Sequence, residues 1–448
     1  MDKIRTVAET LAILHQYHHL VGIERQPKQL KTLDFDGKVI FSNDPKTATV
    51  PPAFFTVQTI QELKKLGGVP DSEYGPGKME PHHPLPEPFS AARLANVTGN
   101  HIDLCKAFRA YIYGDSALVK DYEEILNAKR FPMKVALYSG ESITVTADNP
   151  LIVEDKDGYG EPVALVYDQI IIEPGGQIIC HTNSSINANS VIGNGSDGKE
   201  SIINKGNKGV DGLEGASGNN GADGSDGSEG VGHKNGCYFD GTPGTDGTSG
   251  SLGASGGDGS PGGNVNDLTM NAQSLIGLVR VAAIGGNGGN GGRGGAGGRG
   301  GHGGNGGTVR TSGDYQWCIP GCGGSGGQGG NGGNGGNGGK GGDSGNIYIS
   351  FSDGNPILDV ASFGGLGGEG GKGGFGRMGG FPGKPGGLLA DCVDKQGRNG
   401  KNGRQGNYGV DGVNGELGDD GICGKIYING HERKSNSWWC SNQTGLND

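Results

Sequence analysis

The sequence has little apolar material from which to build a core. Only 32% of its 448 residues are hydrophobic and 6% are aromatic, so a conventional core can form mainly before about residue 204. No apolar run approaches the roughly 18 residues that a membrane-spanning helix needs. The net charge is −11 and no basic cluster occurs, which argues against nucleic acid as a partner.

The N-terminal stretch lacks the uninterrupted apolar segment of a signal peptide. Glu9 and His15 stand among its apolar positions, which is atypical of such a leader. We therefore expect a protein made in a cytoplasm without a signal peptide. We also expect it to act outside the cell, on a virion or as a released protein.

The sequence also lacks the common signatures of catalysis. No GxSxG or HExxH motif stands out, and the GxGxxG matches, such as residues 286–291, follow from the abundance of glycine. None of these matches opens a helix after a strand, as a dinucleotide site requires. The Asp residues of GADGSDGSEG keep a period of three and do not fit the calcium-binding nonapeptide. The sequence therefore predicts no enzyme, no cofactor and no bound metal.

The first 132 residues predict a mostly helical attachment or oligomerisation domain. Residues 2–22 read as an amphipathic helix, and residues 99–130 again have helical spacing. Between them lies a proline-rich loop at residues 67–88. The apolar side of the helix at residues 2–22 can pack within the domain. It can also form a short coiled coil that makes a fibre or homo-oligomer.

From Met133 the apolar period changes to two. Segments such as KVALYSGESITVTADNPLIV are rich in Val, Ile and Thr and are broken by Gly, Asn and Pro, which is typical of strands. Residues 133–204 therefore predict a β-rich base, either a sandwich or solenoid-like.

The remaining chain, residues 205–448, contains most of the 98 glycines. Six runs keep a period of three: 206–230, 241–262, 285–307, 323–342, 364–387 and 397–424. Proline is too sparse in these runs for collagen, and a disordered linker has no reason to hold a period. A left-handed extended helix with three residues per turn fits better, because faces of pure glycine allow neighbouring backbones to approach closely. Such helices need lateral hydrogen bonds, so several must pack together.

These runs, such as GGQGGNGGNGGNGGKGGDSG, resemble glycine-rich proteins with polyglycine-II helical bundles. The closest in style are the tail-fibre-tip adhesins of T-even-like phages. Springtail antifreeze proteins and a glycine-rich receptor tyrosine kinase region are similar in packing. The resemblance covers about half of the chain and implies loops at one end of the bundle that bind a bacterial surface receptor.

The connections between runs alternate in kind. Those after the second, fourth and sixth runs are strand-like, so antiparallel runs would gather them at one end, where they could pair with the strands before Ile203 into one sheet. The other three connections, residues 231–240, 308–322 and 388–396, then meet at the opposite end and contain cysteine. Aromatic side chains on such loops suit recognition, although they also fit an apolar plug that caps the bundle. The predicted binding residues are Tyr238, Phe239, Tyr315, Gln316, Trp317 and Asp391.

Six cysteines are disulfide candidates: Cys237, Cys318, Cys322, Cys392, Cys423 and Cys440. The first four would cluster at the tip. The Cys318–Cys322 spacing alone does not establish a zinc site, because the loop contains no histidine.

Together these features predict a mixed fold. It has an N-terminal α/β domain, a β-strand base and a C-terminal bundle of about six polyglycine-II helices with tip loops. The predicted function is a receptor-binding, adhesin-like protein that recognises a cell-surface protein or glycan. A secreted or inclusion-type toxin or effector is the alternative. Ice binding is a lesser one, because side chains such as Arg293 and His302 are bulky and charged.

Overall fold

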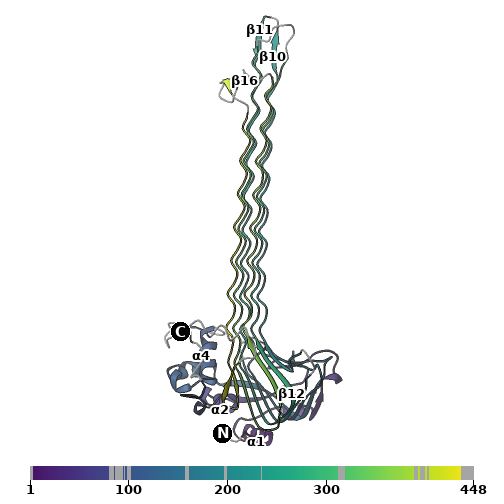
Figure 1. Ribbon diagram of the computed structural model, residues 1–448, viewed down its shortest axis with the longest axis vertical. Helices are drawn as coiled ribbons and strands as arrows, with labels where there is room; N and C mark the ends of the chain where they lie inside the picture. The colour runs from purple at the N-terminus through teal and green to yellow at the C-terminus, as the bar shows by residue number, and fades with distance from the viewer. Residues whose placement is uncertain are drawn as a thin grey trace.

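The strands of the chain join into one large sheet. The computed structural model describes residues 4–79, 85, 94, 96–97, 102–156, 161–195, 199–233, 235–310, 318–387, 392–393, 399–400 and 403–434. Within these residues, 14 strands form a single, mostly parallel sheet that curves into a half-barrel (Figure 1). Two smaller sheets, of three and two strands, lie at the far end of the molecule (Figure 1).

The N-terminal half supplies nine strands of the large sheet. Three of them are long and pair with one another in parallel, and four of the six short ones pair among themselves in the same way. The first and third strands of the chain pair with the first long one. The long strands are β4 (Met133–Val145), β6 (Val163–Ile172) and β8 (Ser184–Asn194). The short strands are β1 (Gln29–Lys31), β2 (Val39–Ser42), β3 (Ala53–Val57), β5 (Leu151–Glu154), β7 (Ile178–Cys180) and β9 (Ile202–Lys205).

The glycine-rich half supplies the other five. They are β12 (Leu268–Ile284), β14 (Ile347–Asp353), β15 (Ile357–Phe363), β18 (Ile426–Ile428) and β19 (His431–Arg433). The long strand β12 pairs in parallel with β8 and β9 on one side and with β14 and β15 on the other. The strand-like connections between glycine runs therefore extend the sheet that the N-terminal half begins.

The described α-helices are four and short, and all precede the long strands. They are α1 (Val7–Tyr17), α2 (Ile60–Gly67), α4 (Ile102–Ile112) and α5 (Glu123–Arg130). Four 3-10 turns accompany them: η1 (Ile23–Arg25), η2 (Thr32–Asp34), η3 (Asp71–Glu73) and η4 (Ser116–Tyr122). None of the described helices combines the length and apolar character needed to cross a membrane.

Apolar side chains cover both faces of the sheet because strand residues alternate in direction. Leu268, Met270 and Ala272 of β12 belong to the core on one face. On the other face a second core forms between the sheet and the helices, where Leu104 and Leu126 are fully buried.

Helix α1 is shorter than the predicted helix over residues 2–22. It begins with a capping box, in which the Thr6 hydroxyl accepts from the N–H of Glu9 and the Glu9 carboxylate accepts from the N–H of Thr6. Val7 and Leu14 are buried in the core of the same chain. This apolar side of the helix is therefore covered within the chain, and self-association through it stays a prediction.

The glycine runs form a long stalk between the sheet and the far end (Figure 1). We call it the glycine stalk. Its first to sixth segments are residues 206–229, 241–266, 285–308, 321–346, 364–387 and 403–425. Segments one, three and five lie beside one another, as do two, four and six, and neighbouring pairs across the two rows are also hydrogen-bonded.

A triplet in the middle of the stalk directs its N–H groups to different neighbours. In the third segment, the N–H of Gly288 donates to the carbonyl of Leu366 in the fifth segment at 2.8 Å. The N–H of Gly289 donates to the carbonyl of Ser260 in the second segment at 2.9 Å. The third N–H, of Asn290, donates to the Asp211 carboxylate of the first segment at 2.8 Å. All backbone donors of the triplet are thus satisfied by other segments.

A constant interval of 79 residues relates the stacked segments. The Asn290 side chain accepts from the N–H of Glu369, just as Asp211 accepts from Asn290, and both pairs are 79 residues apart. Asp258, Asn337 and Glu416 repeat the arrangement in the other row. The strands keep this interval, since Leu268 of β12 pairs with Ile347 of β14, which pairs with Ile426 of β18 in turn.

The predicted fold class is wrong. The strands do not form a separate α/β domain and a sandwich-like or solenoid-like base, because one mostly parallel sheet includes strands from both halves of the chain. No bundle of six polyglycine-II helices is present either, as no described residue after Arg130 lies in a helix. The physical reason is that the chain alternates between sheet and stalk, and both parts are held by hydrogen bonds between segments.

Glycine is required where segments touch. A Cβ on Gly292 would lie 2.0 Å from the carbonyl oxygen of Leu213. We expect Gly292→Ala to destabilise the stalk by about 1–3 kcal/mol or more, because backbone must move to admit the methyl group. Hydrogen exchange of the glycine amides and denaturant unfolding measure this effect. The matched change Arg299→Ala, at an exposed position of the same segment, should alter neither. Equal behaviour of the two variants would contradict the close packing.

Candidate functional site

The far end of the stalk carries a small sheet that holds the first tip loop. The strand β10 (Gly230–His233) pairs antiparallel with β11 (Gly236–Phe239) and parallel with β13 (Val309–Arg310). β10 continues the first stalk segment and β13 continues the third. The two strands are therefore paired in the sheet just as the two segments are paired in the stalk. The strands β16 (Cys392–Val393) and β17 (Asn399–Gly400) form the other small sheet.

A disulfide bond joins two connections at this tip. Cys237 of β11 is bonded to Cys318, which precedes the fourth segment and lies 81 residues away in the sequence. Cys318 is buried, with 3% of its surface exposed. The Asp240 carboxylate accepts from the N–H of Ile319 at 2.8 Å, so it holds the same two connections together.

The disulfide also bears on metal binding. Cys237, Asp240 and Cys318 place their ligand atoms within 4.8 Å of one another. However, the two sulfur atoms are bonded to each other, so neither is the thiolate that a metal ion would require. In this oxidised state the cluster is a crosslink with a neighbouring carboxylate.

Two aromatic side chains of β11 point into solvent. Tyr238 is 65% exposed and Phe239 is 72% exposed. The ring centroid of His233 lies 4.5 Å from that of Tyr238, so the hairpin itself supports the tyrosine. Aromatic side chains of this kind offer a large contact area and lose few rotamers on binding. The hairpin is therefore suited to recognition and does not plug the end of the stalk with these two rings.

Several other predicted site residues are not among those that the structure describes. Tyr315, Gln316, Trp317, Asp391 and Cys440 fall outside the described residues, and of Cys392 only the backbone, in β16, is described. The structure therefore brings together Tyr238, Phe239 and the Cys237–Cys318 bond from the predicted set.

The remaining described cysteines divide into two kinds. Cys322 and Cys423 are disulfide-bonded, whereas Cys105 and Cys180 are thiols. Burial raises the pKa of the Cys180 thiol to about 11, which makes it a poor nucleophile. Disulfides persist mainly in oxidising surroundings.

Sequence reasoning missed the junction between stalk and sheet. Asp267, fully buried just before β12, accepts from Arg109 Nε of α4 at 2.9 Å and from the N–H of Asn346 at 2.7 Å. Burial alone would lower the pKa of Arg109, but the contact with Asp267 raises it above its ordinary value. The pair fixes the helical layer to the root of the stalk. Asp267 and Asn346 are 79 residues apart, so the interval marks them as equivalent positions in successive stacked segments.

Comparison with known proteins yields no relative: no protein-family model, no curated protein and no solved structure matches the chain. The geometry of the chain itself is therefore the basis for a functional proposal.

The tip disulfide gives a direct prediction. We expect Cys237→Ser to increase amide hydrogen exchange in β10 and β11 at least about tenfold, because a crosslink over a long loop contributes about 2–4 kcal/mol. Exchange of the glycine amides midway along the stalk should not change. Cys105→Ser, which alters a cysteine outside any disulfide, serves as the control. If β10 and β11 exchange at the same rate with and without the bond, the crosslink does not order the tip.

Proposed function

We propose that this protein is an adhesin-like, receptor-binding protein. The half-barrel sheet is the base, the glycine stalk is a spacer, and the tip recognises a protein or glycan on a cell surface. The observation that carries the proposal is the exposed pair Tyr238 and Phe239, which a disulfide-anchored hairpin presents at the end of the stalk farthest from the sheet.

The stalk supports this proposal through its own stiffness. Every segment is hydrogen-bonded to neighbours along its length, with N···O distances near 2.8 Å. A spacer tied in this way presents its tip in a fixed orientation, which lowers the entropy lost on binding. The disulfides of Cys237, Cys318, Cys322 and Cys423 support a working site outside a reducing cytoplasm.

The central test removes the two exposed rings. We expect the double variant Tyr238→Ser, Phe239→Ser to lower binding of labelled protein to a panel of intact bacterial cells about tenfold or more, as loss of aromatic anchors typically costs over 1 kcal/mol each. The control is Val410→Ser, Val413→Ser on the sixth stalk segment, where the side chains are 69% and 70% exposed. Binding that survives the first change, or falls equally in the control, would sink the tip assignment.

A second experiment addresses the loop at residues 315–317. Replacement of Tyr315–Trp317 by Ser-Gly-Ser should reduce cell binding while the stalk amides keep their protection from exchange. The same cell assay separates an adhesin from a toxin, because an adhesin leaves bound cells intact. Release of cytoplasmic enzyme from those cells would favour the toxin alternative, and binding to no cell of any kind would overturn the proposal.

A further inference from the structure

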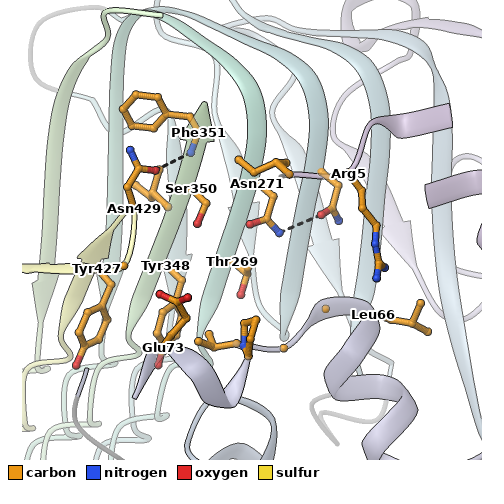
Figure 2. A pocket seen from close by; sticks show the side chains of 18 of the residues that line it. Arg5, Leu66, Glu73, Thr269, Asn271, Tyr348, Ser350, Phe351, Tyr427 and Asn429 are labelled. Atoms are coloured by element: carbon orange, nitrogen blue, oxygen red, sulfur yellow. Dashed lines mark hydrogen bonds between the residues drawn. The ribbon is translucent and has the colours of Figure 1, made fainter. Parts of the chain in front are cut away.

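A cavity of about 560 Å³ lies in the base, between the sheet and the segment that follows α2 (Figure 2). Strands β8, β12, β14 and β18 form its floor. Leu66, Val69 and Glu73, from the end of α2 to η3, line the opposite wall, and Arg5 lies beside them. The volume falls within the range of small-molecule sites in proteins, about 300–1,000 Å³.

A row of polar side chains crosses the floor of this cavity. Asn187 of β8 pairs in register with Asn271 of β12, and Asn271 with Ser350 of β14. Asn429, directly after β18, continues the row. Figure 2 shows Asn271, Ser350 and Asn429 side by side on the sheet. Adjacent strands are about 4.8 Å apart, so the row offers a polar group at each such step.

Part of this row is already engaged within the chain. Asn271 Nδ2 donates to Asn187 Oδ1 at 3.1 Å, and Asn187 Nδ2 donates to Ser185 Oγ at 3.0 Å. Asn429 Oδ1 accepts from the N–H of Phe351 at 2.8 Å. These bonds fix the direction in which each amide faces, so the floor is preorganised.

Other polar atoms of the floor have no well-formed hydrogen bond within the described chain. Thr269 of β12 is 4% exposed and lines the cavity. Its Oγ1 makes no well-formed hydrogen bond, although its interaction with the Tyr113 hydroxyl opposes the rise in pKa that burial causes there. No described residue bonds to Asn271 Oδ1 or Ser350 Oγ. An unsatisfied buried hydroxyl costs about 1–3 kcal/mol. The floor therefore holds hydrogen-bonding capacity that a ligand can use.

The chemistry of the lining selects the ligand. Amides and hydroxyls both donate and accept, which matches the hydroxyl groups of a sugar. Met79 and Leu66 add apolar surface for the C–H faces of sugar rings. The floor carries no charge, and the charged residues of the lining, Arg5, Lys65 and Glu73, are of both signs.

We propose that this cavity binds a neutral oligosaccharide of about two or three sugar units, a size that suits the volume. Asn271, Ser350 and Thr269 supply hydrogen bonds from the floor, and Met79 and Leu66 supply apolar contacts. The site lies at the opposite end of the stalk from Tyr238 and Phe239 (Figure 1). It is therefore separate from the proposed receptor-binding tip, and either site can fail without the other.

The test uses the full chain and defined sugars. Maltotriose, cellotriose and triacetylchitotriose are titrated and followed by saturation-transfer NMR and calorimetry. At least one should bind with a Kd of about 1 mM or tighter. Ser350→Ala removes an oxygen that no described residue uses, so the fold should remain. We expect this variant to weaken binding several-fold and Asn271→Leu to weaken it about tenfold or more.

The controls make each outcome decisive. Asn194→Leu places the same change at the exposed end of β8, away from the cavity, and should leave sugar binding intact. Circular dichroism checks the fold of every variant. The proposal is overturned if no neutral trisaccharide binds, if only inorganic phosphate or an acidic sugar binds, or if Ser350→Ala and Asn271→Leu bind as the parent protein does.

Discussion

The lateral hydrogen bond between extended segments is the interaction on which the structure depends. A glycine run has no bonds within itself, so each N–H must find an acceptor on a neighbour. Those acceptors are close only because glycine has no Cβ. At Gly292 a Cβ would lie 2.0 Å from a carbonyl oxygen, and at Gly289 the corresponding distance is 2.1 Å. The two bare positions of each GGX triplet are thus dictated by contact, while the third position faces solvent.

The third position has its own rule. Where an Asn, Asp, Ser or His stands 79 residues earlier, its side chain accepts from this N–H, as with His302 and Phe381. The edges of the stalk use other acceptors. Thr242, Thr245 and Thr248 accept from first-segment N–H groups, and Asp411, Asn414 and Asp420 accept from Gly376, Gly373 and Gly367. At both edges of the stalk, backbone N–H groups are therefore partly satisfied by side chains of neighbouring segments.

The sequence indicated the local patterns but not how they are joined. Alternation predicted strands from Met133, and the glycine period predicted lateral pairing. Strand-like spacing allowed β12 to join the strands before Ile203 in one sheet, but periodicity alone could not name its partner or register. Leu268 of β12 pairs with Ser184 of β8 on one side and with Ile347 of β14 on the other, at two different sequence intervals. For the tip, Tyr238 and Phe239 could be chosen as exposed aromatics of a short loop. The base cavity could not, since Asn187, Asn271 and Ser350 meet only through strand register.

The sheet explains how such a stalk can be ordered at all. Fixing one residue costs about 1–2 kcal/mol in backbone entropy, and a net hydrogen bond returns only about 0.5–1.5 kcal/mol. Glycine segments alone would therefore be near balance, with many alternative registers three residues apart. The apolar strands remove that choice. Because β12, β14 and β18 pair at the interval that the stalk also uses, the buried sheet sets the register of every triplet above it. The stalk is thus an extension of the sheet, and its stiffness as a spacer begins with the core at its base.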